Sequence, residues 1–290
     1  MWFYAALGMA LISGLCAIIS KRAMRTISPL TFFWGVLTVS APIVWIFAWS
    51  KGVPDFSKLF FVGVIGSVVF YSISKILFYR TIRDAELSHV HPLVALGPVF
   101  TLGSSFLILS EVPSLIGFIG IGITLVGTYV LNISSIREGL WEPFKILFRN
   151  NLSLLMLYSV LIGSISPVFD KLAIIHTSPQ NEIFALLMED LVIVFGLLPW
   201  MLLKNKTVAI EIKFNWKWIL TFGLLQAVSN TLAFISLAGA NPGLVTSVFR
   251  TQIFFVLLFS YLFFGDRPKT ETIVGSIIMI GGLVVLKLAT

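Results

Sequence analysis

Residues 111–127 read EVPSLIGFIGIGITLVG, and residues 266–282 read DRPKTETIVGSIIMIGG. Each stretch begins with an acidic residue, any residue and a proline, and continues as an apolar segment that contains glycines. At a shift of 155 residues, four pairs coincide: Glu111 with Asp266, Pro113 with Pro268, Gly120 with Gly275, and Gly127 with Gly282. Agreement at four such positions in one register indicates an internal repeat.

The repeat extends beyond these two stretches. At the same shift, Ala85 coincides with Ala240, Ser105 with Ser260 and Leu107 with Leu262; at a shift of about 150, Lys21 coincides with Lys171 and Ser28-Pro29 with Ser178-Pro179. The pattern predicts two similar halves, residues 1–132 and 153–290. Residues 133–152 mix apolar and charged side chains, which is typical of a connecting segment that lies in the membrane interface.

The composition indicates that the solvent of this chain is a bilayer. Of its 290 residues, 58% are hydrophobic and 11% are charged, whereas globular proteins carry about 25% charged residues. A helix needs about 20 mostly apolar residues to cross the hydrocarbon layer. Windows of that kind predict ten helices, at 2–20, 29–49, 59–79, 88–110, 114–132, 153–175, 181–203, 214–236, 242–263 and 271–288.

The expected fold class is therefore an all-α integral membrane protein with ten transmembrane helices in two five-helix repeats. Because five is odd, the second repeat must enter the membrane inverted relative to the first. Inverted repeats of this kind are common in transporters, whose substrate sites lie near the middle of the bilayer.

Charge and cysteine content exclude several other classes. The net charge of +7 comes from basic residues scattered in loops, which indicates topology signals and contact with membrane lipid rather than a nucleic-acid partner. Cys16 is the only cysteine, so the chain cannot form an internal disulfide. No motif for a metal, a cofactor or a catalytic constellation stands out, and the sequence predicts a multi-pass protein of the cell membrane that is not an enzyme.

Basic residues are distributed unequally between the two expected faces of the membrane. The loops after odd-numbered helices hold Lys21, Arg22, Arg25, Arg80, Arg83, Arg137, Lys145, Arg149, Lys204, Lys206, Lys213, Lys217, Arg267 and Lys269; the opposite side has Lys51, Lys58, Lys171 and Lys287. The positive-inside rule places the first group in the cytoplasm and both chain termini outside.

The arrangement resembles the EamA-like branch of the drug/metabolite transporter superfamily over essentially the whole chain. The resemblance rests on the two five-helix halves, on Lys21 and Lys171 near the ends of the first helix of each half, and on the acidic-X-proline turns followed by glycine-spaced helices. The family implies alternating-access transport of small metabolites, often outward. It also implies cytoplasmic termini, in disagreement with the charge distribution.

Candidate substrate-binding residues are the ionisable groups inside apolar windows, since each costs about 2.5 kcal/mol or more at mid-bilayer unless it has a partner or a wet cavity. At about 1.5 Å of rise per residue, the second half brings Glu189, Asp190, Arg250, Gln226 and Asn230 to a similar depth. The alternative interpretation is that Arg250 forms a structural ion pair with Glu189 or Asp190.

The first half offers further candidate binding residues, and the second half offers a candidate for proton coupling. Lys75 is expected either to contact an anionic substrate group or to extend to the interface, and His91 would enter the cavity-lining fourth helix. One carboxyl of the adjacent pair Glu189 and Asp190 could hold a proton and couple transport to proton movement. The glycines spaced seven apart predict close helix packing, or else dimerisation, so the protein would be a monomer or a homodimer.

The leading functional prediction is a secondary active transporter that moves an amino acid or a similar metabolite, in the direction of export. A second prediction is an anion antiporter for phosphorylated sugars or nucleotide sugars, which Lys75 and Arg250 favour and the carboxylates disfavour. The alternative from another class is a non-transporting membrane enzyme or scaffold.

Overall fold

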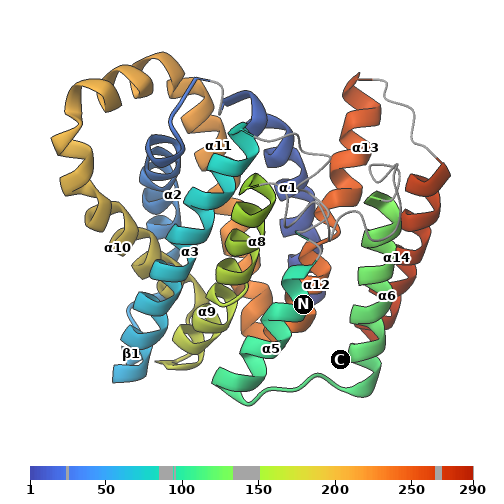
Figure 1. The fold of residues 1–290 in the computed structure, drawn as a ribbon. Coiled ribbons are helices and arrows are strands. Elements are labelled where there is room, and N and C mark those ends of the chain that lie inside the picture. The colour runs from blue at the N-terminus through green and yellow to red at the C-terminus, as the bar shows by residue number, and fades with distance from the viewer. Residues whose placement is uncertain (24–25, 85–93, 95, 133–150, 265–269, 290) are drawn as a thin grey trace.

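The computed structural model describes residues 1–23, 26–84, 94, 96–132, 151–264 and 270–289. Helices make up nearly all of this part of the chain (Figure 1). They are α1 (Trp2–Ala23), α2 (Pro29–Lys51), α3 (Lys58–Asp84), α5 (Gly97–Leu109), α6 (Leu115–Asn132), α8 (Asn151–Gly163), α9 (Ser166–Ile175), α10 (Glu182–Leu203), α11 (Asn205–Gly239), α12 (Pro242–Phe249), α13 (Gln252–Phe264) and α14 (Thr270–Leu288). Two short strands, β1 (Asp55–Phe56) and β2 (Thr177–Ser178), pair antiparallel.

Length and composition confirm an integral membrane protein. Six helical segments of the described chain are long and apolar enough to cross a bilayer: Pro29–Lys51, Lys58–Asp84, Asn151–Ile175, Glu182–Leu203, Thr207–Gly239 and Pro242–Phe259. Shorter apolar helical segments are Trp2–Ala17, Gly97–Leu109, Leu115–Val130 and Ile273–Leu288. Large apolar side chains such as Trp45, Ile46 and Phe47 point outward, as a lipid-facing surface requires. The count of ten spans stays a prediction.

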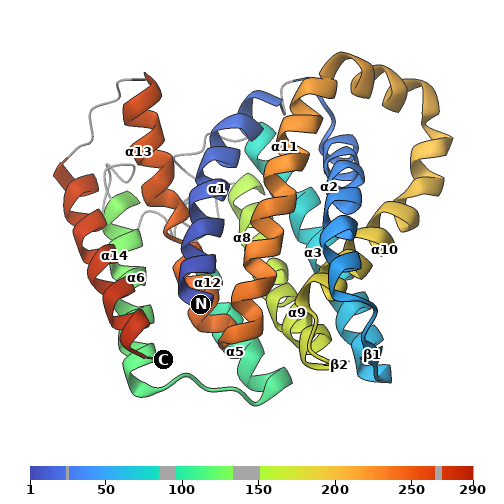
Figure 2. The same ribbon diagram turned by 180° about the vertical axis from the view of Figure 1, so that it is seen from behind.

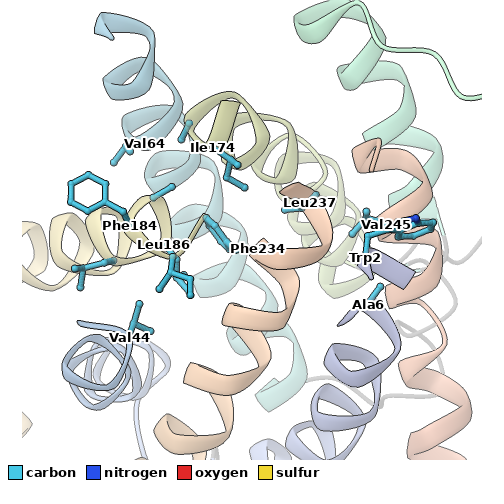
Figure 3. Packing of buried hydrophobic residues seen from close by; sticks show 14 of the residues in the cluster. Trp2, Ala6, Val44, Val64, Ile174, Phe184, Leu186, Phe234, Leu237 and Val245 are labelled. Carbon is cyan, nitrogen blue, oxygen red and sulfur yellow. The ribbon is translucent and has the colours of Figure 1, made fainter. Parts of the chain in front are cut away.

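Helices from the two halves of the sequence pack against each other. α6 lies along α14, α1 along α11, α2 against α10 and α11, and α3 against α8 and α9. The α6–α14 pair forms one edge of the molecule and α10 the other, in both views (Figures 1 and 2). The buried core between them draws on several of these helices (Figure 3), with Trp2, Ala6, Val44, Val64, Ile174, Phe184, Leu186, Phe234, Leu237 and Val245 among its members.

Glycines set the close approach of α6 and α14. A Cβ at Gly127 would lie 2.5 Å from the backbone nitrogen of Met279, and one at Gly120 would lie 2.9 Å from that of Leu286. On the facing helix, a Cβ at Gly282 would lie 2.7 Å from the backbone nitrogen of Thr124. The prediction that these glycines serve helix packing is confirmed, and the packing is within one chain.

Two of the apolar segments are interrupted in the middle. The α8 helix ends at Gly163 and α9 begins at Ser166, just before Pro167 in its first turn, where the missing N–H of proline is tolerated. The α12 helix ends at Phe249 and α13 begins at Gln252, so Arg250 lies in the interruption. Ser104 of α5 donates a hydrogen bond to the carbonyl of Ser164 at 3.2 Å. Pro98 lies in the first turn of α5.

The strand pair ties the first half of the chain to the second at one face of the molecule. Asp55 pairs with Ser178 and Phe56 with Thr177. Beside the strands, Lys51 forms an ion pair of 2.7 Å with Glu182. The connection between α2 and α3 is thus joined to the connection between α9 and α10.

Candidate functional site

An acidic cluster, made of Ser67, Asp170 and Glu189, lies in the interior between α3, α9 and α10. The Ser67 hydroxyl is 2.8 Å from Glu189 Oε2 and also within hydrogen-bond distance of Asp170 Oδ1. The Ser166 hydroxyl lies 3.5 Å from the same Asp170 oxygen. Asp170 and Glu189 are 8% and 6% exposed. The second Glu189 oxygen, Oε1, is buried and has no hydrogen-bond partner within the described part of the chain.

Close packing of α3 on α9 builds this cluster. A Cβ at Gly63 would lie 2.5 Å from the backbone nitrogen of Ala173, and one at Gly66 would collide with the ring of Phe169. The two helix backbones can therefore approach until Ser67, one residue beyond Gly66, reaches Asp170. The two glycines of α3 thus allow the helix contact that brings Ser67 and Asp170 together.

Asp190 has a separate environment. Its Oδ2 accepts a hydrogen bond of 3.1 Å from the Ser40 hydroxyl of α2. Adjacent residues of a helix do not face each other, so Glu189 turns to α3 and α9 while Asp190 turns to α2. The carboxyl group that shares the Ser67 hydroxyl with Glu189 is that of Asp170. That Glu189 and Asp190 both line a substrate site stays a prediction.

Sequence reasoning missed Asp170 because it precedes Lys171, which was assigned to a helix end. The Lys171 ammonium donates to the carbonyls of Leu237 at 2.7 Å and Ala238 at 3.2 Å, at the C-terminal end of α11. Asp170 therefore belongs to the acidic cluster, whereas Lys171 connects α9 to the end of α11. The sequence signal for Asp170 was Ser166, one helical turn before it on the same face.

Lys75 lies in the aromatic surroundings provided by its own helix. Its ammonium is 5.3 Å from the centre of the Tyr71 ring and 6.0 Å from those of Phe78 and Tyr79. The nearest ring is thus that of Tyr71, four residues further from the C-terminal end of α3 at Asp84. Aromatic rings on both sides of Lys75 along the helix thus surround its ammonium, and its contact with an anionic substrate group stays a prediction.

Arg250 lies at the interruption between α12 and α13, and its guanidinium packs against Gly97 at the start of α5. A Cβ at Gly97 would lie 2.9 Å from Arg250 Cζ. The Nε atom of Arg250 is buried and has no hydrogen-bond partner among the described residues. In the described part of the chain, no ion pair joins Arg250 to Glu189 or Asp190, so the ion-pair interpretation is not supported. Its charge instead lies within range of that of Lys75.

Gln226 and Asn230 share one face of α11, as predicted. The Gln226 amide donates a hydrogen bond of 2.6 Å to Asn230 Oδ1. The Tyr71 side chain lies near the Asn230 side chain and within electrostatic range of Asp170 and Asp190. Tyr71 therefore stands between the acidic side of the interior and Lys75. It is a further residue that sequence reasoning missed, although Ser67, Tyr71 and Lys75 are spaced four apart on one face.

The arrangement as a whole separates charge. Ser67 and Lys75 are eight residues apart on α3, which corresponds to about 12 Å of rise. The carboxyl groups of Asp170 and Glu189 lie near Ser67. Lys75 and Arg250, the cationic pair, lie toward the other end of this distance. Gln226, Asn230, Tyr71, Lys75 and Arg250 are all half-buried. His91 lies outside the described residues, and within those residues no three His, Cys, Asp or Glu side chains are placed to hold a metal ion.

The chain is similar to a known protein family and to solved structures. The model of the EamA-like transporter family matches residues 1–133 and 151–288. A solved structure, described only as the crystal structure of a protein, is similar with a TM-score of 0.71 and 12% sequence identity, over 99% of this chain and 96% of that chain. At this identity the likeness shows the fold alone. The comparison with curated proteins gives no match.

Proposed function

The chain belongs to the EamA-like transporter family, and from this premise we propose that it is a secondary active transporter that exports a small organic metabolite by alternating access. It is a multi-pass protein of the cell membrane. We further propose that its helices form ten spans in two inverted halves. The repeat between residues 111–127 and 266–282 supports this topology, as do the interrupted segments at Ser164 and Arg250, since discontinuous helices surround many transporter sites.

The substrate site is proposed to lie between the cationic pair and the acidic cluster. The observation that carries the proposal is that Lys75 and Arg250 lie inside the bundle without a carboxylate partner within the described residues. Cations left without a partner at this depth are costly and are typically functional. An amino acid carries both a carboxylate and an ammonium group, which complement the cationic and the acidic sides, and Gln226 and Asn230 offer hydrogen bonds to either.

The second candidate is an anion antiporter for phosphorylated sugars or nucleotide sugars. This candidate is favoured by the lack of an ion-pair partner for Lys75 and Arg250 within the described residues. One anionic substrate could neutralise both charges at once. The membrane-enzyme and scaffold alternatives lose ground, since the family is one of transporters.

We propose that the acidic cluster holds the coupling proton. Two carboxyl groups approach one hydroxyl, and the Ser67 hydroxyl has a single proton, which it can donate to only one of them. The other contact is a hydrogen bond only if that carboxyl group brings its own proton. Because two adjacent buried carboxylates repel each other, one proton shared between Asp170 and Glu189 is the favoured state. The Ser166 hydroxyl, 3.5 Å from Asp170 Oδ1, completes the surroundings of this pair.

Infrared spectroscopy tests the proton-holding pair without a known substrate. A protonated carboxyl group absorbs apart from a carboxylate, and its band should be present in the parent protein at neutral pH. The band should weaken in both Asp170→Asn and Glu189→Gln. Glu182→Gln is the matched control on α10, because Glu182 is ion-paired with Lys51 at 2.7 Å. A parent without the band, or a band that neither cluster variant changes, contradicts the proposal.

A thermal-shift screen tests the substrate site. The purified protein is tested with amino acids, phosphorylated sugars and nucleotide sugars, because a ligand that binds only the native state raises its apparent stability. The stabilising class should act on the parent protein and lose its effect in Arg250→Gln and Lys75→Gln. If a ligand stabilises these variants as much as the parent, the site lies elsewhere.

A further inference from the structure

A basic pocket lies at the face of the molecule opposite the strand pair. Four helix ends enclose it: the start of α2, the end of α3, the end of α10 and the start of α11. Its volume is about 250 Å³, and its lining comprises Ser28, Pro29, Leu30, Thr31, Ile76, Arg80, Arg83, Trp200, Met201, Lys204 and Val208. Nothing in the transport mechanism proposed above uses these residues.

Among the residues that the structure describes, three cations and no carboxylate line the pocket. Arg83 is partly neutralised by Asp84, at 2.8 and 3.2 Å. Arg80 and Lys204 take part in no ion pair within the described chain, and the Lys204 ammonium lies 5.1 Å from the centre of the Trp200 ring. The pocket therefore keeps a positive charge of about two, which calls for an anionic occupant.

Glu211 contacts the pocket-lining residue Ser28. Glu211 of α11 accepts hydrogen bonds of 3.2 Å from the Ser28 backbone N–H and 2.8 Å from the Ser28 hydroxyl through the same oxygen, Oε2. It holds the start of α2 against α11 and is not among the lining residues. Glu211 thus positions one wall of the pocket and leaves Arg80 and Lys204 without a partner.

The surroundings of the pocket indicate that the anion is attached to a lipid. Beside Lys204, the side chains of Leu202 and Leu203 are 62% and 83% exposed. An apolar surface suited to acyl chains therefore adjoins the pocket. Tryptophans such as Trp200 are typical of the headgroup level of a bilayer. The volume is also smaller than the roughly 300–1,000 Å³ of pockets that enclose a whole small molecule.

We propose that this pocket binds the phosphate headgroup of an anionic membrane lipid, with Arg80, Arg83 and Lys204 contacting the phosphate. Basic pockets between transmembrane helices are suited to such headgroups, and arginine can bind phosphate oxygens in a bidentate manner. Because Arg80 and Arg83 belong to the first half of the chain and Lys204 to the second, a bound headgroup bridges the two halves at the face opposite β1 and β2.

Native mass spectrometry of the delipidated full-length protein tests the proposal. Phosphatidylglycerol should bind at low concentration, and phosphatidylcholine should not compete at equal concentration. Each basic residue near a membrane surface contributes about a fivefold factor in affinity, so Arg80→Gln should weaken binding about fivefold. The triple variant Arg80→Gln, Arg83→Gln and Lys204→Gln should weaken it on the order of 100-fold.

The matched control is Lys217→Gln. Lys217 is exposed and lies 5.8 Å from the Trp216 ring, so it reproduces the lysine–tryptophan contact outside the pocket. Its lipid affinity should equal that of the parent. Equal affinity of the parent and Arg80→Gln, which changes a single exposed side chain and should fold, overturns the proposal. Displacement of the lipid by millimolar inorganic phosphate or glycerol phosphate also overturns it, because the pocket would then serve soluble phosphates.

Discussion

The contact of α6 with α14 provides a test of the fold that depends on no substrate. In Gly127→Ala, the new methyl group would lie 2.5 Å from the backbone nitrogen of Met279, whereas ordinary contacts begin at 3.4 Å. The helices must therefore separate locally by about 0.9 Å, the difference between the two values. Overpacking of this kind costs about 1–3 kcal/mol. A helical alanine regains about 0.5–1 kcal/mol relative to glycine.

Gly122→Ala on the same helix isolates the packing cost, because a Cβ there meets nothing within 4 Å. It should stabilise the protein by about 0.5–1 kcal/mol through the helix preference alone. The difference between the two variants is then the overpacking cost, about 1–3 kcal/mol, or at least about a fivefold change in the unfolding equilibrium constant. Reversible unfolding in mixed micelles, followed by circular dichroism, measures both. If Gly127→Ala is as stable as Gly122→Ala, the direct backbone contact does not exist.

Three further predictions concern the interior. Gly97→Ala should displace the Arg250 guanidinium and weaken ligand binding at least tenfold in a thermal-shift titration, whereas Gly103→Ala, where a Cβ meets nothing within 4 Å, should not; equal affinities would contradict the contact. Lys171→Met should lower the unfolding free energy by about 2–3 kcal/mol, because its charged hydrogen bonds to α11 are lost; an unchanged denaturant midpoint would contradict that role. Ser67→Ala should slow substrate-driven proton flux in proteoliposomes while substrate counterflow continues, and a fall in both alike would argue for a purely structural hydroxyl.

The sequence predicts the helical membrane class because the relevant signals are local. Apolar windows mark the helices, and the seven-residue spacing from Gly120 to Gly127 places both glycines on one face. The spacing from Gln226 to Asn230 likewise predicts a shared face, and the hydrogen bond between them confirms it. Such signals need only the period and the rise of a helix.

The partners of the ionisable residues could not be predicted in this way. The rise along a helix gives the depth of Glu189 and Arg250, but not the rotation of α10 about its axis or the identity of the helix opposite. Those depend on α3 packing against α9 through Gly63, a contact between residues 110 positions apart in the chain, Gly63 and Ala173. The pairing of Glu189 with Asp170 follows from that packing, and the place of Arg250 beside Gly97 follows from the packing of α12 against α5.

The strand pair has a mechanical consequence. Main-chain hydrogen bonds between β1 and β2, with the ion pair of Lys51 and Glu182 beside them, resist stretching but allow rotation about the line that they define. At the far edge, the close contact of α6 with α14 joins the same two halves a second time (Figure 1). The halves are therefore fastened to each other at both edges. Movement of one half against the other is thus expected in the helices between these two fixed contacts.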